Sequence, residues 1–257
     1  MNRDEKRLYL IRTLLEEQPA YRKIMIPADP ANQKRLLRSL FNVRMPGEIS
    51  EEFLRVQDEY LREETRLKGI TDLKDLAPVR PGIFLRQGDI TTLRCDAIVN
   101  AANSGMTGCY QPCHNCIDNC IHTYAGIQLR NFCAEIMAEQ GFEEPTGQAK
   151  ITPAFNLPCK YVIHTVGPIV SGPLTAEHEA QLASCYRSCL ALADKYGIKS
   201  IAFCCISTGL FGFPQQQAAE TALQTVLGYK AEKNSNIEVI FNVFKDDDLR
   251  IYRDLLG

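Results

Sequence analysis

The pattern of apolar and polar positions divides the chain into two parts. Near the N-terminus, apolar residues recur at helical spacing, at Leu8, Leu10, Ile11, Leu14 and Leu15. Two more helices are expected over residues 32–41 and 50–67, the latter beginning after a capping Ser50 with acidic residues in its first turn. Residues 1–77 are therefore predicted to form a helical N-terminal extension that packs on the main domain. A separate partner-binding module is the alternative.

From Ile83 onward, short apolar runs alternate with longer helical patterns. Strands are expected at residues 83–86, 96–99, 161–166, 200–206 and 237–244, and helices at residues 117–139, 175–196, 215–229 and 247–256. Near-continuous apolar strands between helices indicate an α/β fold with a mostly parallel sheet covered on both faces. Residues 78–257 are therefore assigned to one main domain. Sheets of this kind bind ligands at the carboxyl ends of their strands, here the loops after Val99, Ile206 and Val243.

Composition indicates an ordinary soluble globular protein. Of the 257 residues, 45% are hydrophobic and 23% are charged, and the net charge is −2. This balance favours neither a nucleic acid nor a membrane surface as partner, and no apolar run approaches the roughly 20 residues that cross a bilayer. The N-terminus lacks the apolar core of a signal peptide. The cysteine count is 11, an odd number, and several lie inside apolar runs, so we expect a reducing compartment and a cytoplasmic location.

One loop concentrates soft metal ligands, at Cys109, Cys113, His114, Cys116 and Cys120. A catalytic zinc takes three protein ligands and keeps one open position. Adjacent side chains tend to diverge, so we expect Cys109, His114 and Cys116 to bind zinc, with Cys113 as the alternative ligand. Cys116 begins a predicted helix, whose dipole is expected to lower the pKa of its thiol. The alternative is a reduced loop with one redox-sensitive thiol.

A second loop has the features of an anion site. Residues 207–214 read STGLFGFP and stand between a predicted strand and a predicted helix. The two glycines let the backbone approach a ligand closely, and the proline leaves amides at the positive end of the helix dipole. We expect a nest for phosphate oxygens, the alternative being a plain strand–helix turn.

The other histidines are expected to be structural. His122 lies inside a predicted helix and is expected to form structural hydrogen bonds. His164 lies in an apolar strand and is expected to be a hydrogen-bonded core residue. His178 is expected to face solvent from a helix.

Five motifs in this order resemble the macrodomain family and cover residues 83–257. They are GDIT at 88–91, VNAAN at 99–103, YVIHTVGP at 161–168, STGLFGFP at 207–214 and DLRIY at 248–252. Membership implies a three-layer α/β/α sandwich on a six-stranded mixed sheet that binds ADP-ribose in a surface cleft.

One departure from the usual family pattern is informative. In hydrolytic macrodomains a glycine-rich loop usually follows the asparagine step and leads to a Val-Asp pair. Here the longer segment 107–116 replaces that loop, and Ile117-Asp118 stands where the pair would. The chain therefore resembles the zinc-dependent branch of the family, whose members also carry a helical N-terminal extension.

This resemblance implies a zinc-dependent hydrolase that removes mono-ADP-ribose from modified protein side chains and releases ADP-ribose. Bacterial relatives are associated with a sirtuin-type transferase and a lipoyl-carrier protein as the modified substrate. The alternatives are a reader module without turnover, and a hydrolase of O-acetyl-ADP-ribose or ADP-ribose 1″-phosphate. The joint presence of Asn103, Asp118 and the metal loop favours an enzyme.

The resemblance also assigns ligand-binding roles. Asp89 accepts a hydrogen bond from the adenine amino group, the Ile90 amide lies beside it, and Phe244 stacks on the adenine face. The two phosphates are assigned to the amides of Ser207, Thr208, Gly209, Leu210, Phe211 and Gly212. Phe211 is also placed against the distal ribose.

The catalytic roles are assigned in the same way. Asn103 hydrogen-bonds the distal ribose, and Asp118 activates water or a ribose hydroxyl. Zinc, bound by Cys109, His114 and Cys116, lies over that ribose. Whether zinc or Asp118 activates the nucleophile, and which amino-acid linkage is cleaved, stay open at this point.

Overall fold

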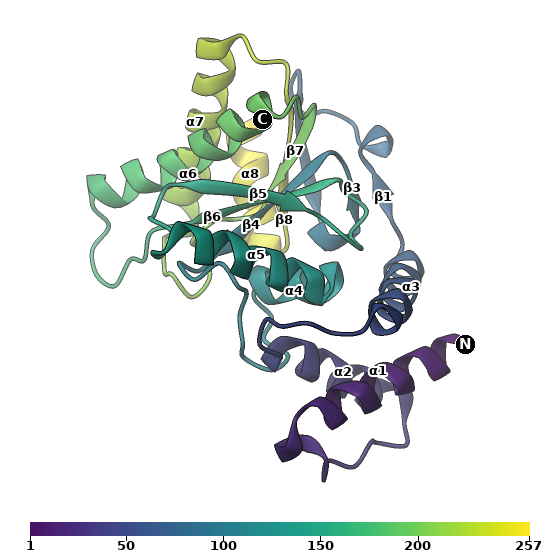
Figure 1. The fold of residues 1–257 in the computed structure, drawn as a ribbon. Coiled ribbons are helices and arrows are strands. Elements are labelled where there is room, and N and C mark those ends of the chain that lie inside the picture. Colours follow the sequence, from purple (N-terminus) through teal and green to yellow (C-terminus); the bar gives the residue numbers. More distant parts are fainter.

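Three capped helices make up the N-terminal part of the computed structural model, which describes residues 1–257. They are α1 (Arg3–Glu17), α2 (Pro30–Val43) and α3 (Glu51–Lys68). The side chains of Asn2, Asp29 and Ser50 each accept a backbone N–H of the following first turn, which fixes where the helices begin. Figure 1 shows these helices grouped on one side of the sheet. The expected N-terminal helices are confirmed.

A mixed sheet forms the centre of the molecule. Its strands are β2 (Ile83–Gln87), β4 (Ala97–Ala102), β5 (Ala149–Pro153), β6 (Tyr161–Val166), β7 (Ser200–Phe203) and β8 (Glu238–Val243). The six strands lie in the order β2-β8-β7-β4-β6-β5, and all neighbours are parallel except β5 and β6. Two short strands, β1 (Thr71–Asp72) and β3 (Leu93–Arg94), pair separately.

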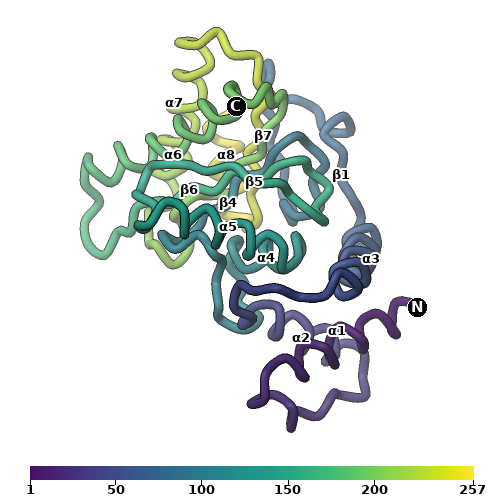
Figure 2. The backbone as a smooth tube through the Cα atoms, viewed as in Figure 1, coloured from purple at the N-terminus to yellow at the C-terminus, as the bar shows by residue number.

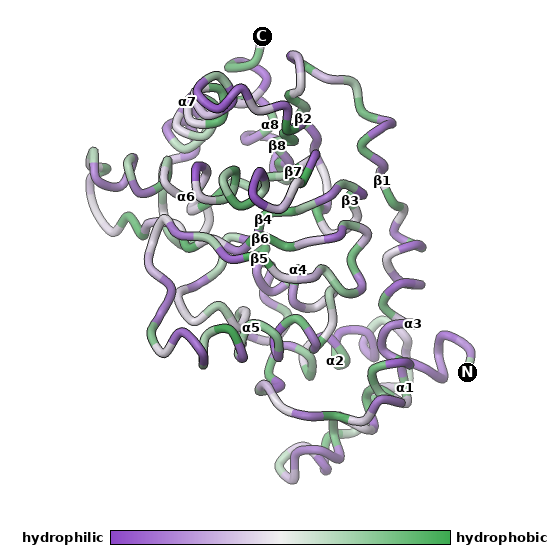
Figure 3. The backbone as a smooth tube through the Cα atoms, turned by 45° about the horizontal axis from the view of Figure 1, so that its top comes forward, coloured by the Kyte–Doolittle hydropathy of each residue, from purple (hydrophilic) through white to green (hydrophobic).

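Helices cover both faces of this sheet. α4 (Ile117–Ala125) and α5 (Ile127–Gln140) lie on one face, and α6 (Ala176–Lys195), α7 (Gln215–Lys233) and α8 (Asp246–Leu256) lie on the other (Figure 1). The main core of 43 buried residues fills the space between these layers. Figure 3 shows apolar stretches gathered on the central strands. The predicted three-layer sandwich is confirmed, and no helix combines the length and apolarity needed to cross a membrane.

The structure corrects two expected elements. The single helix predicted over residues 117–139 is two helices, because the chain turns at Gly126 with φ +96°, a conformation that side-chain-bearing residues rarely adopt. β5 was absent from the prediction. It is an antiparallel edge strand with one buried position, and it ends at Pro153, so its sequence lacks the apolar run of the central strands.

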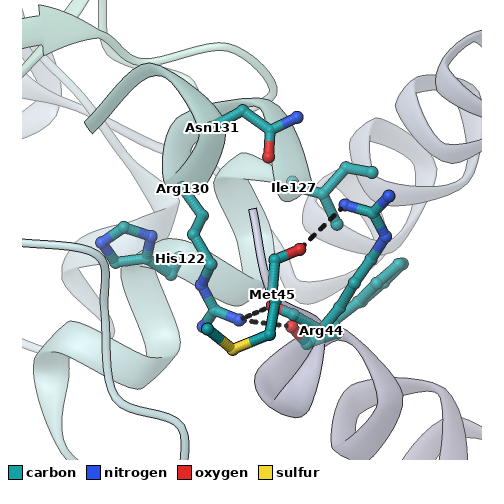
Figure 4. Close-up of a pocket in the computed structure, with 8 residues that line it drawn as sticks. Arg44, Met45, His122, Ile127, Arg130 and Asn131 are labelled. Carbon is teal, nitrogen blue, oxygen red and sulfur yellow. Dashed lines mark hydrogen bonds between the residues drawn. The ribbon is translucent and has the colours of Figure 1, made fainter. Parts of the chain in front are cut away.

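The N-terminal helices have their own apolar core. It contains 12 buried residues, of which only Ile127 comes from the main part of the chain. Hydrogen bonds also cross the junction: Gln57 accepts from the Ile127 amide at 3.0 Å, and Asn42 donates to Thr123 Oγ1 at 2.9 Å. Arg130 of α5 donates to the backbone carbonyl of Asn42. It also donates to the backbone carbonyl of Arg44 at the end of α2 (Figure 4). The domain boundary between residues 77 and 78 stays a prediction.

Candidate active site

A cleft of about 1190 Å³ lies beside the loops that follow β4, β7 and β8. The strand ends named from the sequence therefore do border one concave surface. The predicted site residues that line it are Asp89, Ile90, Asn103, Cys109, His114, Cys116, Asp118, Ser207, Thr208, Gly209, Leu210, Phe211 and Phe244. Gly212 is the one predicted site residue outside this lining. The roles of all of them stay predictions.

A buried carboxylate faces this cleft from the first turn of α4. Asp118 is 4% exposed and accepts hydrogen bonds from Asn100 Nδ2 at 2.8 Å and Asn103 Nδ2 at 3.2 Å. Burial raises the pKa of Asp118 to about 6, although the bonds from the two asparagines and the charge of Arg130 oppose that shift. The two amides therefore fix the orientation of a carboxylate that has little contact with solvent.

Asn100 is itself held by a buried histidine. Asn100 Nδ2 lies 3.1 Å from His164 Nδ1, and His164 Nε2 lies 3.0 Å from Thr152 Oγ1. Burial lowers the pKa of His164 to about 3, so the ring is neutral near pH 7. Because Nδ1 must accept from the amide, Nε2 carries the proton and donates to Thr152. The expectation of a hydrogen-bonded core histidine is confirmed.

The side-chain amide of Asn103 forms most of its hydrogen bonds within the protein. Its Nδ2 donates to the Gly108 carbonyl at 3.2 Å as well as to Asp118, and its Oδ1 accepts from the Gly105 amide at 3.0 Å. Both donors of the amide group are therefore in use. A contact with a ribose hydroxyl, as the resemblance implies, requires Asn103 Oδ1 to be the acceptor.

Two thiols and an imidazole come together in the loop between β4 and α4. The ligand atoms of Cys109, His114 and Cys116 all lie within 4.8 Å of one another, and Cys109 Sγ is 3.5 Å from His114 Nδ1. Cys113 turns the other way, and its Sγ is 3.1 Å from Ser39 Oγ of α2. Sulfur and imidazole are donors that zinc prefers, so the cluster fits a zinc ion with one position left open.

The prediction that the pKa of the Cys116 thiol is lowered was wrong. Burial raises the pKa of the Cys116 thiol to about 12, and the neighbouring Cys109 and Asp118 add to this increase. The Asn119 amide donates to Cys116 Sγ at 3.3 Å and lowers the pKa, as expected at a helix N-terminus. Desolvation outweighs that bond, and burial at this position could not be seen in the sequence.

A second cluster of ligand-type atoms is fully buried. It consists of His122, Cys133 and His164. Both ring nitrogens of His164 are already hydrogen-bonded, so this cluster has fewer atoms free to bind a metal than the first cluster. The ring nitrogens of His122 have no hydrogen-bond partner, which corrects the expectation that they form structural hydrogen bonds. Burial lowers the pKa of His122 well below its ordinary value, so its ring is also neutral.

The glycine-bearing loop after β7 presents unpaired amides to the cleft. The amides of Ser207, Gly209, Leu210 and Phe211 make no hydrogen bond to the protein. Those of the other two predicted residues are used internally, Thr208 N by the Cys205 carbonyl at 3.5 Å and Gly212 N by the Gly209 carbonyl at 3.1 Å. Ser207 has φ +65°, which turns the backbone sharply after the strand. Four unpaired amides support the predicted phosphate nest.

Comparisons with known proteins identify the family. The Macro domain profile matches residues 99–222. A protein of Treponema medium named protein-ADP-ribose hydrolase is 60% identical over 261 aligned positions that cover 100% of both chains. The chain belongs to the macrodomain family. A protein of Staphylococcus aureus (strain MSSA476) with the same name is 50% identical over 96% of this chain and 93% of its own.

Solved structures place this macrodomain in the same family. A Trypanosoma brucei macrodomain in complex with ADP-ribose matches with a TM-score of 0.66 at 29% identity, over 90% of this chain and 97% of that chain. That match is long enough to include part of the N-terminal helices, which the Macro domain profile does not cover.

The predicted adenine residues also line this macrodomain's cleft. Asp89 accepts from the amide and hydroxyl of Thr91, at 2.9 and 2.6 Å, and from Lys68 Nζ at 3.0 Å. Burial acts to raise the pKa of Asp89, but the bonds from Thr91 and the charge of Lys68 outweigh it and lower the pKa. Phe244 is 74% exposed at the end of β8. A hydrogen-bond acceptor and an exposed aromatic ring are the groups that the adenine prediction assigns to this part of the cleft.

Sequence reasoning missed Lys68. It is the last residue of α3, and besides pairing with Asp89 its Nζ lies 3.2 Å from the centre of the Tyr124 ring. No local pattern indicates these contacts, because Asp89 and Tyr124 lie far along the chain from α3. The N-terminal helices thus reach the cleft.

Proposed function

We propose that this macrodomain is a zinc-dependent protein-ADP-ribose hydrolase that removes mono-ADP-ribose from modified side chains and releases ADP-ribose. The names of the full-length relatives at 60% and 50% identity support the activity. The observation that carries the proposal is that the buried carboxylate of Asp118 and the Cys109–His114–Cys116 cluster line the same cleft. A reader module needs neither of them.

Binding is assigned to three groups of residues that line the cleft. Asp89 accepts from the adenine amino group beside the Ile90 amide, and Phe244 stacks on the ring. The unpaired amides of Ser207, Gly209, Leu210 and Phe211 bind the diphosphate. Phe211 then packs against the distal ribose, and the Asn103 carbonyl oxygen accepts from a ribose hydroxyl.

The reaction is hydrolysis at the anomeric carbon of the distal ribose. The oxygen of a water molecule bonds to that carbon, the bond to the modified side chain breaks, and the side chain leaves with a proton. Asp118 takes a proton from this water at a carboxylate oxygen held by Asn100 and Asn103 and returns it to the departing side chain. Where Asp118 takes the proton of a ribose hydroxyl instead, the resulting alkoxide takes the proton of the water. Zinc, held by Cys109, His114 and Cys116, supplies Lewis-acid chemistry that polarises an oxygen or lowers the pKa of bound water.

Two finer parts of the proposal concern the biological setting. The substrate is an ADP-ribosylated protein, and the family resemblance points to a lipoyl-carrier protein modified by a sirtuin-type transferase. A cytoplasmic location is supported by the cysteines, which are all free thiols and mostly buried in the apolar core.

The test is to incubate the zinc-loaded, full-length protein with defined mono-ADP-ribosylated proteins and to follow free ADP-ribose. Substrates with acidic-ester, serine and arginine linkages identify the bond that is cleaved. We expect release from at least one of them, and no release after zinc is removed with a chelator. Tight binding without release would make the protein a reader. Release from O-acetyl-ADP-ribose alone would make it a deacetylase.

A further inference from the structure

The loop that carries the metal-binding cluster rests on a helix of the N-terminal extension. Figure 2 shows the chain between β4 and α4 reaching down to α2. At this contact Arg38 of α2 donates from Nη2 to the His114 carbonyl at 2.7 Å and to Asn119 Oδ1 at 3.0 Å. One guanidinium nitrogen therefore joins a predicted zinc ligand to a side chain of α4.

Asn119 extends this connection to the other two predicted ligands. Its side chain is fully buried, and its Nδ2 donates to the Cys109 carbonyl at 3.3 Å and to the Gln111 carbonyl at 3.0 Å. Its backbone amide donates to Cys116 Sγ at 3.3 Å. Asn119 thus hydrogen-bonds to Cys109 and Cys116, and Arg38 hydrogen-bonds to His114.

The two side chains depend on each other. With both amide hydrogens donated to the loop, Asn119 Oδ1 faces Arg38, and a charged donor there fixes which way the amide points. Without Arg38, the Asn119 oxygen and the His114 carbonyl both lose a charge-assisted bond. The remaining contacts of the loop with α2 are then those of Cys113, whose amide donates to Asn42 Oδ1 at 2.9 Å and whose Sγ lies 3.1 Å from Ser39 Oγ.

We propose that Arg38 is a positioning residue for the metal-binding cluster and acts through Asn119 and the His114 carbonyl. The N-terminal extension then contributes to metal binding in the active site through Arg38. The inference rests on the zinc dependence of the proposed function, but its readout is zinc affinity and not turnover. Mutation of a residue that orients metal ligands through hydrogen bonds typically weakens metal binding by about 10–100-fold.

The test compares Arg38→Met with Arg38→Lys and Arg35→Met in the full-length protein. Arg35 lies one turn earlier on α2, is exposed, and its side chain makes no hydrogen bond to the loop, so Arg35→Met is a matched control. Zinc affinity is measured by competition with a chromogenic chelator. Thermal unfolding of the zinc-free proteins shows whether each variant is folded.

We expect Arg38→Met to bind zinc about 10–100-fold more weakly than the wild type. Arg38→Lys should recover much of the affinity, because an ammonium can donate to the same two oxygens. Arg35→Met should bind zinc as the wild type does. Hydrolysis by Arg38→Met should fall at limiting zinc and return with excess zinc.

Wild-type affinity in both Arg38 variants would overturn the inference, and so would equal losses in Arg38→Met and Arg35→Met. These outcomes leave the proposed hydrolase intact. A wild-type protein that binds no zinc would instead refute the metal part of the proposed function, and the inference with it.

Discussion

Arg130 is the side chain that ties the end of α2 to the beginning of the metal loop. Its Nε donates to the Thr107 carbonyl at 2.7 Å, and its Nη1 donates to the carbonyls of Phe41, Asn42 and Arg44 at 3.1, 2.8 and 2.6 Å. Arg130 is 4% exposed. Figure 4 shows it lying between His122 and the backbone at Arg44. We predict that Arg130→Met, which keeps the aliphatic part of the side chain, destabilises the protein.

The size of the effect follows from these contacts. Two guanidinium nitrogens donate, and one charge-assisted bond of about 1.5–3 kcal/mol counted for each nitrogen gives a gross loss of roughly 3–6 kcal/mol. Removing a cation from a buried position returns part of its desolvation cost, so we expect a net loss of about 2–4 kcal/mol. For a slope of about 2 kcal/mol per molar urea, the midpoint falls by about 1–2 M.

The assay is urea unfolding of the zinc-free protein, followed by circular dichroism. Arg250→Met is the control, since Arg250 is 70% exposed and pairs only with the exposed Asp247. That change should stay within about 0.5 kcal/mol of the wild type. A loss below about 1 kcal/mol for Arg130→Met, or equal losses for both variants, would refute this account of how the two parts are joined.

Three further predictions concern the cleft and its buried support. Asp118→Asn should lower kcat/KM for ADP-ribose release by roughly 10²–10⁴-fold while ADP-ribose still binds, because only the proton acceptor is lost; unchanged turnover would remove Asp118 from the reaction. Phe244→Ala should weaken ADP-ribose binding by about 1–3 kcal/mol in isothermal titration calorimetry, with little change in kcat, and equal affinity would exclude stacking. Burial lowers the pKa of His164 to about 3, so the unfolded chain takes up a proton at this side chain before the folded protein does. Its contribution to stability is therefore full above about pH 6.5 and declines as the pH falls, by about 2 kcal/mol between pH 7 and pH 5. Urea unfolding at both pH values should show that His164→Asn loses less stability over this interval than the wild type, and identical losses would contradict the neutral ring.

The central strands and most helices could be predicted from the sequence because their signals are local, whereas the six-stranded mixed sheet was implied by the family resemblance. β6 was predicted at its observed bounds, Tyr161–Val166, since a central strand buried on both faces is a continuous apolar run. β5 pairs with a neighbour along one edge only, and its mixed composition lacks a continuous apolar run. The break at Gly126 was missed because the residues on both sides have helical patterns.

The candidate site divides in the same way. Cys109, His114 and Cys116 are close in sequence, so their clustering could be predicted from spacing, and the structure brings their ligand atoms together. Arg38 and Lys68 could not be found, because each meets the site through contacts between segments more than 20 residues apart. The pKa of Cys116 was misjudged for a related reason: burial depends on what packs against the loop from elsewhere in the chain.

The central claim is that Cys109, His114 and Cys116 hold a zinc ion in the cleft that contains Asp118. The most direct measurement compares bound zinc and ADP-ribose release in Cys109→Ala and Cys113→Ala, whose thiols lie four residues apart but face the cluster and α2 respectively. We predict that Cys109→Ala loses both zinc and release, and that Cys113→Ala retains both. Loss of zinc from Cys113→Ala alone, or full release by a Cys109→Ala protein without zinc, would contradict the account.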